Sequence, residues 1–244
     1  MNWFQYLTTA SSWSGDDGIT HLLIQHLEYS GSALLLTMLI ALPLGLALGH
    51  LHRGGFVVLS LANLGRAIPA FGILVIFAVS SWGVDLITLT ITLVLFALPQ
   101  VLTNTYTGIA EADADVVQAA RGIGMSELQI LRRIELPRAL PLIASGVRSA
   151  AVQIVGTATI AAYAGAGGLG QIVFRGYDSN LPALQIAGAI LVVALALLAQ
   201  GLLGLVQRAV TPVPLRRYGL IFRAPTRRRS RVEPVEALAN RISS

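Results

Sequence analysis

Five long stretches of this chain contain no Asp, Glu, Lys or Arg, and together they span residues 29–52, 67–84, 86–110, 149–174 and 179–207. A helix needs about 20 apolar residues to cross a bilayer, and lipid forces each backbone polar group to find a partner within its own segment. Charged residues make up 12% of the chain, against roughly 25% in soluble domains. These features exclude an ordinary soluble enzyme and predict an all-α integral membrane protein with about five transmembrane helices.

Two of the stretches predict interrupted helices. The second should extend upstream of residue 67, which places Arg66 near its start or in a break. The fourth contains the run GAGGLG at residues 165–170, and each glycine inside a helix costs about 1 kcal/mol. We therefore expect a helix followed by a short break there. In the third stretch we expect the helix to end near Pro99 or a turn or two beyond it.

The basic residues predict how the chain is oriented. All 17 are Arg, none lies in residues 1–28, and many lie between the third and fourth stretches or after the fifth. Cytoplasmic segments of membrane proteins carry an excess of positive charge. The pattern predicts an external N-terminal segment (1–28), a transmembrane domain (29–208) and a basic, disordered cytoplasmic tail (209–244). The tail would adhere to anionic lipid of the inner leaflet.

Residues suited to catalysis or metal binding are scarce in the apolar stretches. The chain has no cysteine, which excludes disulfides and thiolate metal sites. His21, His26, His50 and His52 fall at the ends of apolar stretches with no acid at ligand spacing. We interpret them as interfacial residues, so neither a metal site nor an enzyme embedded in the membrane is expected.

The segment between the third and fourth stretches is too elaborate for a simple connection. Residues 108–138 predict two short helices, the first capped by Asp113 or Asp115 and the second capped by Ser126 and ended by Pro137. Gly122 and Gly124 would form the turn between them. The apolar and small residues of these helices predict a docking surface for a soluble partner. The alternative is a hairpin that lies on the membrane surface.

This segment resembles the EAA loop of permease subunits of binding-protein-dependent ABC importers. The matching residues are Gln118-Ala119-Ala120, Gly124 and Ile134-Glu135-Leu136-Pro137. Further stretches, among them NLGRAIPAFGIL (63–74), LTNTYTGI (102–109) and IVGTATIAAYAGAGGLGQIVFRG (154–176), are similar to the osmoprotectant branch. The resemblance implies a type I ABC importer permease fold with a cytoplasmic EAA coupling-helix loop.

The resemblance also implies a function and partners. The chain would translocate glycine betaine, proline betaine, carnitine or choline by alternating access, with methionine or a sulfonate as the alternative cargo. An external solute-binding protein would deliver the solute, and partner ABC ATP-binding subunits would use the ATP and Mg, so this chain would bind no cofactor and would not be an enzyme. A second permease subunit would complete the path in the cell (inner or plasma) membrane, and nucleic acid is not an expected partner. The alternative outside the transporters is a structural or signalling membrane protein that docks a soluble partner and transports nothing.

The resemblance assigns two sets of residues. Residues 115–124 would form the coupling helix, and the ATPase-coupling loop would comprise Asp113, Gln118, Ala119, Ala120, Gly122, Gly124, Ile134, Leu136 and Pro137. Gln118 departs from the glutamate of the family, and Arg66 stands where glutamine is frequent. The pathway or gate candidates are Asn63, Arg66, Pro69, Thr157, Thr159, Tyr163, Gly165, Gly167, Gly168 and Gly170. The alternative for these glycines is tight helix packing.

Overall fold

The computed structural model describes residues 2–211 except for 68, 81, 82 and 84. Every regular element in the described part is helical, as the sequence predicts. The basic tail after Pro212 lies outside the described residues, as does Trp82. The elements are α1 (Trp3–Thr8), a 3₁₀ turn (Ala10–Trp13), α2 (Ile19–His50), α3 (Gly55–Ala67), α4 (Ala70–Val79), α5 (Leu86–Ala110), α6 (Ala114–Gly122), α7 (Glu127–Ile130), a π-turn (Leu131–Glu135), α8 (Leu136–Ala161), a 3₁₀ turn (Ala162–Ala164), α9 (Gly170–Asp178) and α10 (Pro182–Val210).

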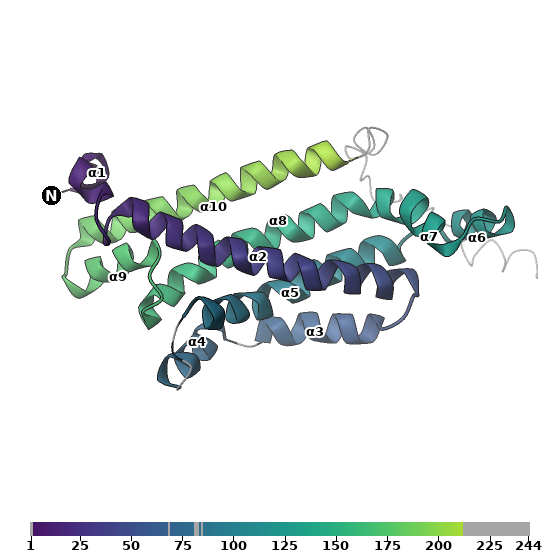
Figure 1. The fold of residues 1–244 in the computed structure, drawn as a ribbon, viewed down its shortest axis with the longest axis horizontal. Coiled ribbons are helices and arrows are strands. Elements are labelled where there is room, and N and C mark those ends of the chain that lie inside the picture. Colours follow the sequence, from purple (N-terminus) through teal and green to yellow (C-terminus); the bar gives the residue numbers. More distant parts are fainter. Residues whose placement is uncertain (1, 68, 81–82, 84, 212–244) are drawn as a thin grey trace, which may run out of the picture. The chain divides into compact units, whose positions relative to one another are not determined.

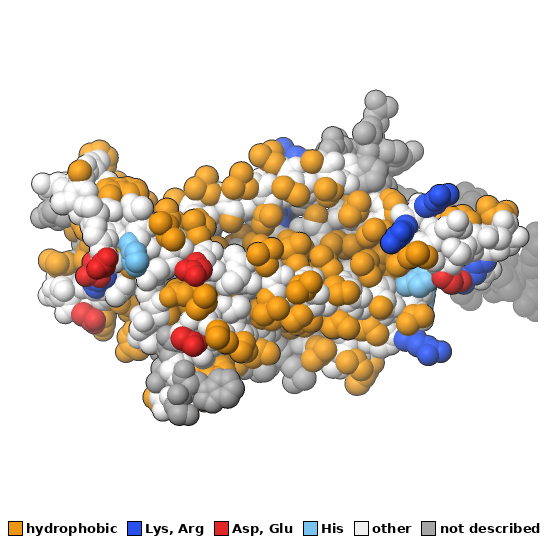
Figure 2. All heavy atoms as spheres, viewed as in Figure 1, with side chains coloured by type: hydrophobic (Ala, Val, Ile, Leu, Met, Phe, Trp, Pro, Cys, Tyr) orange, Lys and Arg blue, Asp and Glu red, His pale blue; other side chains and the backbone are white. Residues whose placement is uncertain are grey.

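Four helices of the described part are long and apolar enough to cross a membrane. They are α2, α5, the continuous helical segment Glu127–Ala164 and α10. In sequence order each packs beside the next, so that α2 contacts α5, α5 contacts α8 and α8 contacts α10 (Figure 1). The main apolar core lies where α2, α5 and α8 meet. On the face shown in Figure 2, hydrophobic side chains cover the middle of the bundle and charged side chains gather toward its ends.

The second stretch does not form one membrane-spanning helix, in contrast to the other four stretches. The structure has two shorter helices here, with α3 ending at Ala67 and α4 beginning at Ala70. Pro69 takes an extended conformation between them, with φ −74° and ψ 115°. A proline disfavours helical geometry in the residue that precedes it, which explains a boundary at this point. Arg66 lies in the last turn of α3, one residue before that helix ends, and so is not in the break itself.

Other helix ends also differ from the expected ones. Helix α2 begins at Ile19, inside the segment expected to lie outside the membrane, and α5 continues through Pro99 as far as Ala110. The expected break in the glycine-rich run is confirmed. Gly165, Gly167 and Gly168 have φ angles of +90°, +81° and +73°, a region of backbone conformation that favours glycine.

Small residues bring the central helices close together. A Cβ atom at Gly49 of α2 would lie 2.8 Å from Cβ of Ile109 in α5, and one at Gly146 of α8 would lie 2.6 Å from Cβ of Asn104. Real Cβ atoms do not approach so closely, so only glycine fits at these crossings. Close approach through small residues is how helices gain packing energy in lipid, where apolar burial alone gives little.

Candidate coupling surface and polar cavity

The two predicted helices between the third and fourth stretches are confirmed as α6 and α7. Asp113 caps α6, since its Oδ1 accepts hydrogen bonds from the amides of Asp115 at 3.0 Å and Val116 at 3.5 Å. Ser126 caps α7 in a reciprocal arrangement with Gln129. Gly124 lies between the helices at φ +86°. These local signals fold residues 111–135 into a hairpin, which we call the coupling hairpin.

The expected helix end at Pro137 is wrong. The chain passes from α7 through the π-turn directly into α8, and Pro137 lies in the first turn of α8. A proline inside an α-helix removes one hydrogen bond and its ring clashes with the carbonyl four residues earlier. The π-turn already shifts the bonding, because the amide of Leu136 donates to the carbonyl of Leu131. The wider turn accommodates the proline, so the helical segment continues from the hairpin into the bundle.

The coupling hairpin has a small core of its own and an exposed apolar face. Val117, Ala120 and Ile130 are buried together. Ala120 therefore packs inward, whereas Gln118 and Ala119 are exposed. The exposed apolar side chains are Val116, Leu128 and Ile123, of which Ile123 is 81% exposed. Leu136 and Pro137 are half-buried at the start of α8, and Ile134 packs against the hairpin core.

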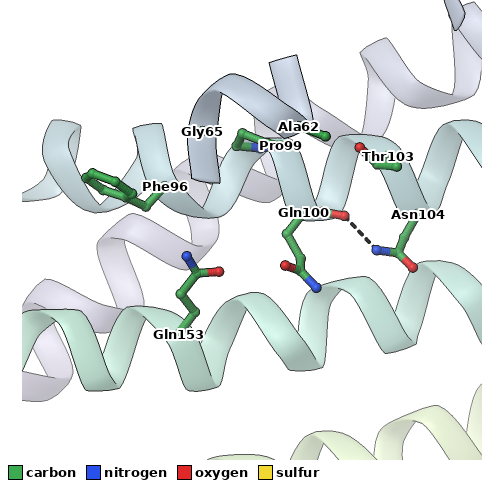
Figure 3. Close-up of a pocket in the computed structure, with 8 residues that line it drawn as sticks. All are labelled: Ala62, Gly65, Phe96, Pro99, Gln100, Thr103, Asn104 and Gln153. Carbon is green, nitrogen blue, oxygen red and sulfur yellow. Dashed lines mark hydrogen bonds between the residues drawn. The ribbon is translucent and has the colours of Figure 1, made fainter. Parts of the chain in front are cut away.

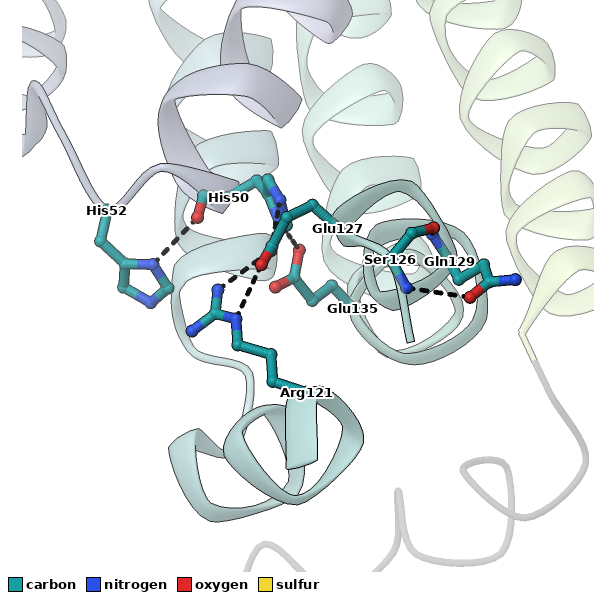
Figure 4. Close-up of polar contacts among 7 residues, drawn as sticks. All are labelled: His50, His52, Arg121, Ser126, Glu127, Gln129 and Glu135. Carbon is teal, nitrogen blue, oxygen red and sulfur yellow. Dashed lines mark hydrogen bonds and ion pairs between the residues drawn. The ribbon is translucent and has the colours of Figure 1, made fainter. Parts of the chain in front are cut away.

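A series of polar side-chain contacts joins the hairpin to the end of α2 (Figure 4). Arg121 of α6 donates two hydrogen bonds to the Glu127 carboxylate, at 2.8 Å and 3.0 Å. Nε2 of His50 lies 3.2 Å from Glu127, and Nδ1 of His50 lies 2.7 Å from Glu135. Glu135 is fully buried.

The interpretation of His26 as an interfacial residue at a helix end is wrong, whereas His50 does end α2 but makes contacts that were not expected. His50 lies against two carboxylates that are distant in the sequence. His26 is buried within the bundle, where its Nε2 lies 3.2 Å from the carbonyl oxygen of Val155. A search for acids near the histidines along the sequence cannot find contacts that helix packing creates.

A polar cavity lies between α3, α5 and α8 (Figure 3). Its volume is about 70 Å³, and it is lined by Ala62, Gly65, Phe96, Pro99, Gln100, Thr103, Asn104 and Gln153. The side chain of Asn104 donates to the carbonyl oxygen of Gln100 at 2.8 Å. The Gln100 and Gln153 side chains extend from facing helices into the same region. None of these polar residues is among the predicted pathway residues, although Gln100, Thr103 and Asn104 share one helix face by their spacing.

The predicted pathway residues do not gather at this cavity. Among those whose side chains the structure describes, none lines it. Asn63 is exposed on α3, Pro69 lies at the break, and the side chain of Arg66 is outside the described part. Thr157 is half-buried in α8, and Thr159 donates to the carbonyl of Val155 at 3.1 Å. Tyr163 is exposed, with its ring centroid 5.0 Å from that of Phe174.

The glycine-rich run packs tightly against α2 and α8. The amide of Gly168 donates to Oε1 of Gln25 at 3.1 Å, and a Cβ atom at Gly167 would lie 2.5 Å from the same oxygen. A Cβ atom at Gly170 would overlap the carbonyl oxygen of Thr159. These contacts support the tight-packing interpretation of the glycines. Gly165 differs, because nothing lies near its added Cβ position.

Comparison with known proteins places these features in a family context. The model of the family "binding-protein-dependent transport system inner membrane component" matches residues 41–212. A glycine betaine/carnitine/choline transport system permease from Bacillus subtilis is 34% identical, with 77% of this chain and 86% of that protein covered. A carnitine transport permease from Listeria monocytogenes is 37% identical over 79% of this chain and 86% of its own length. An osmoprotectant import permease from Salmonella typhimurium is 33% identical over 81% and 94%, respectively.

A solved structure shares the architecture. A chain of the MetNI methionine ABC transporter in an inward-facing conformation superposes with a TM-score of 0.68 and 25% sequence identity. The match covers 80% of this chain and 96% of that one. The type I ABC importer permease fold expected from the sequence is confirmed.

Proposed function

Because this chain belongs to the family of binding-protein-dependent transport system inner membrane components, we propose that it is the membrane subunit of an ATP-driven importer for a compatible solute. The proposed cargo is glycine betaine, proline betaine, carnitine or choline. The observation that carries this proposal is the similarity to osmoprotectant permeases, which extends over more than three quarters of the chain. An external binding protein would deliver the solute, and a second permease subunit would complete the path.

The coupling hairpin would dock a partner ATPase. Its exposed apolar side chains are Val116, Ile123 and Leu128. Exposed apolar side chains of this kind are typical of protein–protein contact sites. The Asp113 cap at the start of α6 and the glycine turn at its end define the shape of this surface. ATP and Mg would be used by the ATPase subunits. The hairpin end of the bundle would then face the cytoplasm, in keeping with the excess of arginine there. The N-terminal helix would lie outside.

The polar cavity would form part of the solute path. The cavity is small, at about 70 Å³, and alternating access would widen it by moving the helices that line it. Amide side chains suit a zwitterionic solute, because they donate to its carboxylate without placing a permanent charge in the membrane. Phe96 also lines the cavity, and its ring would contact the quaternary ammonium group once the path opens.

Replacement of Gln153 tests the role of the cavity. We expect Gln153→Leu to lower solute uptake about tenfold or more, because an amide at the path is replaced by a group that cannot hydrogen-bond. Assembly with the ATPase should not change. Gln200→Leu is the matched control, since Gln200 is exposed on α10 and does not line this cavity. Equal uptake by the two variants would contradict the assignment.

The function as a whole is tested by uptake of labelled solute into proteoliposomes that contain this chain, its ATPase and its binding protein. We expect uptake of glycine betaine that requires both ATP and the binding protein, with carnitine, choline and proline betaine as competitors. Competition by methionine alone would favour the alternative cargo. ATP turnover without any uptake would contradict an importer for these solutes.

A further inference from the structure

His50 occupies a position that the transport proposal does not use. It is the last residue of α2, and its ring lies between two carboxylates of the coupling hairpin. Helices α5 and α8 are joined to the hairpin by the chain itself, whereas α2 continues into α3 instead. Any movement of the hairpin must therefore reach α2 through side-chain contacts.

The contacts at His50 differ in kind from the packing around them. An apolar cluster also bridges this region, with Leu46 of α2, Leu131 of the hairpin and Leu136 of α8 among its members. Apolar contacts are not directional, so helices can slide across them. Charge-assisted hydrogen bonds fix both a distance and a direction. The two ring nitrogens of His50 face two different carboxylates, so the ring relates α2 to two points of the hairpin.

Glu135 depends on this one contact. It is fully buried, and within the described part of the chain His50 is its hydrogen-bond partner, while Oε1 has none. A buried carboxylate is costly unless it is paired. Separation of α2 from the hairpin would leave Glu135 without a partner, so the two elements are held together. Arg121 extends the same network onto α6, the helix with the exposed docking face.

We propose that His50 is a positioning residue that latches α2 to the coupling hairpin, so that displacement of the hairpin by the ATPase moves α2 together with α8. This proposal rests on the proposed function, because the partner ATPase supplies the force that displaces the hairpin. It assigns His50 and Glu135 a role in coupling rather than in ATPase docking, since neither belongs to the exposed apolar face. Loss of the latch should leave ATP hydrolysis in place and reduce the transport that each ATP drives.

The test measures uptake and ATP hydrolysis in the same proteoliposomes of the complete transporter. We expect His50→Leu to lower solute transported per ATP about tenfold, within the range of known coupling energies. His50→Arg should retain most of the coupling, because arginine donates to both carboxylates. His52→Leu is the matched control: His52 is exposed beside His50, and its Nδ1 lies near the His50 carbonyl rather than near the hairpin.

A second variant covers the case in which unpaired Glu135 prevents folding. In the double variant His50→Leu/Glu135→Gln no buried charge is left uncompensated, so the protein should fold and still be uncoupled. A wild-type ratio in the double variant, or equal losses in His52→Leu, would overturn the latch. Wild-type liposomes that take up no solute would instead contradict the proposed function.

A further measurement tests the proposed role of His50 without any transported solute. Hydrogen exchange of the amides at residues 46–52 is followed in the assembled complex with and without ATP. We expect a nucleotide-dependent change in the wild type that is lost in the double variant. The same change in both proteins would overturn the proposal.

Discussion

Replacement of Ile123 by aspartate is expected to prevent assembly of this chain with its ATPase. Ile123 is 81% exposed at the end of α6, so the substitution should leave the fold of the chain intact. In the complex an isoleucine at an apolar contact contributes about 1.5–3 kcal/mol by burial. Aspartate removes that contribution and adds an unpaired charge, which costs about 2–5 kcal/mol. A total of about 3 kcal/mol or more weakens binding at least about 100-fold.

The measurement is copurification of the ATPase with the tagged permease, followed by titration to obtain the affinity. Ile123→Leu is the matched control, because it keeps an apolar side chain at the same position and should assemble as the wild type does. Thermal unfolding of the isolated chain checks that Ile123→Asp folds. If Ile123→Asp assembles with unchanged affinity, the exposed face of the coupling hairpin does not dock the ATPase.

Much of the fold follows from the sequence because lipid leaves few alternatives. Long uncharged stretches must become helices in a bilayer, and three of the five expected stretches correspond to single continuous helices. The break in the glycine-rich run is predictable because glycine weakens a helix, and the structure adds that three of these glycines take positive φ angles. Asp113 and Ser126 mark the starts of α6 and α7, because capping is a local interaction.

The features that the sequence did not predict depend on packing. Glu135 and His50 are separated by 85 positions, and no sequence motif connects the two residues. The continuation of the helix through Pro137 depends on a π-turn, which composition does not indicate. Gln153 joins the polar cavity only because α8 packs against the face of α5 that carries Gln100 and Asn104.

Two glycine-to-alanine substitutions should have opposite effects on stability. Gly170 begins α9, and an added Cβ would overlap the carbonyl oxygen of Thr159 and lie 2.8 Å from Cβ of Ala162. Because both neighbours are backbone or short side chains, the turn itself must shift, and we expect a loss of about 3 kcal/mol. Gly156 lies within α8, is exposed and has open space at its Cβ position. Alanine there should stabilise the helix by about 1 kcal/mol.

The measurement is unfolding of each purified variant in detergent, with solute uptake by the assembled transporter as the second readout. The two variants differ only in the position of one added methyl group, so each is the control for the other. Tight packing at Gly170 predicts that stability and uptake fall together in Gly170→Ala. A variant with wild-type stability and impaired uptake would favour a gating role for this glycine over packing, because only a moving element needs the absence of a side chain in one of its states.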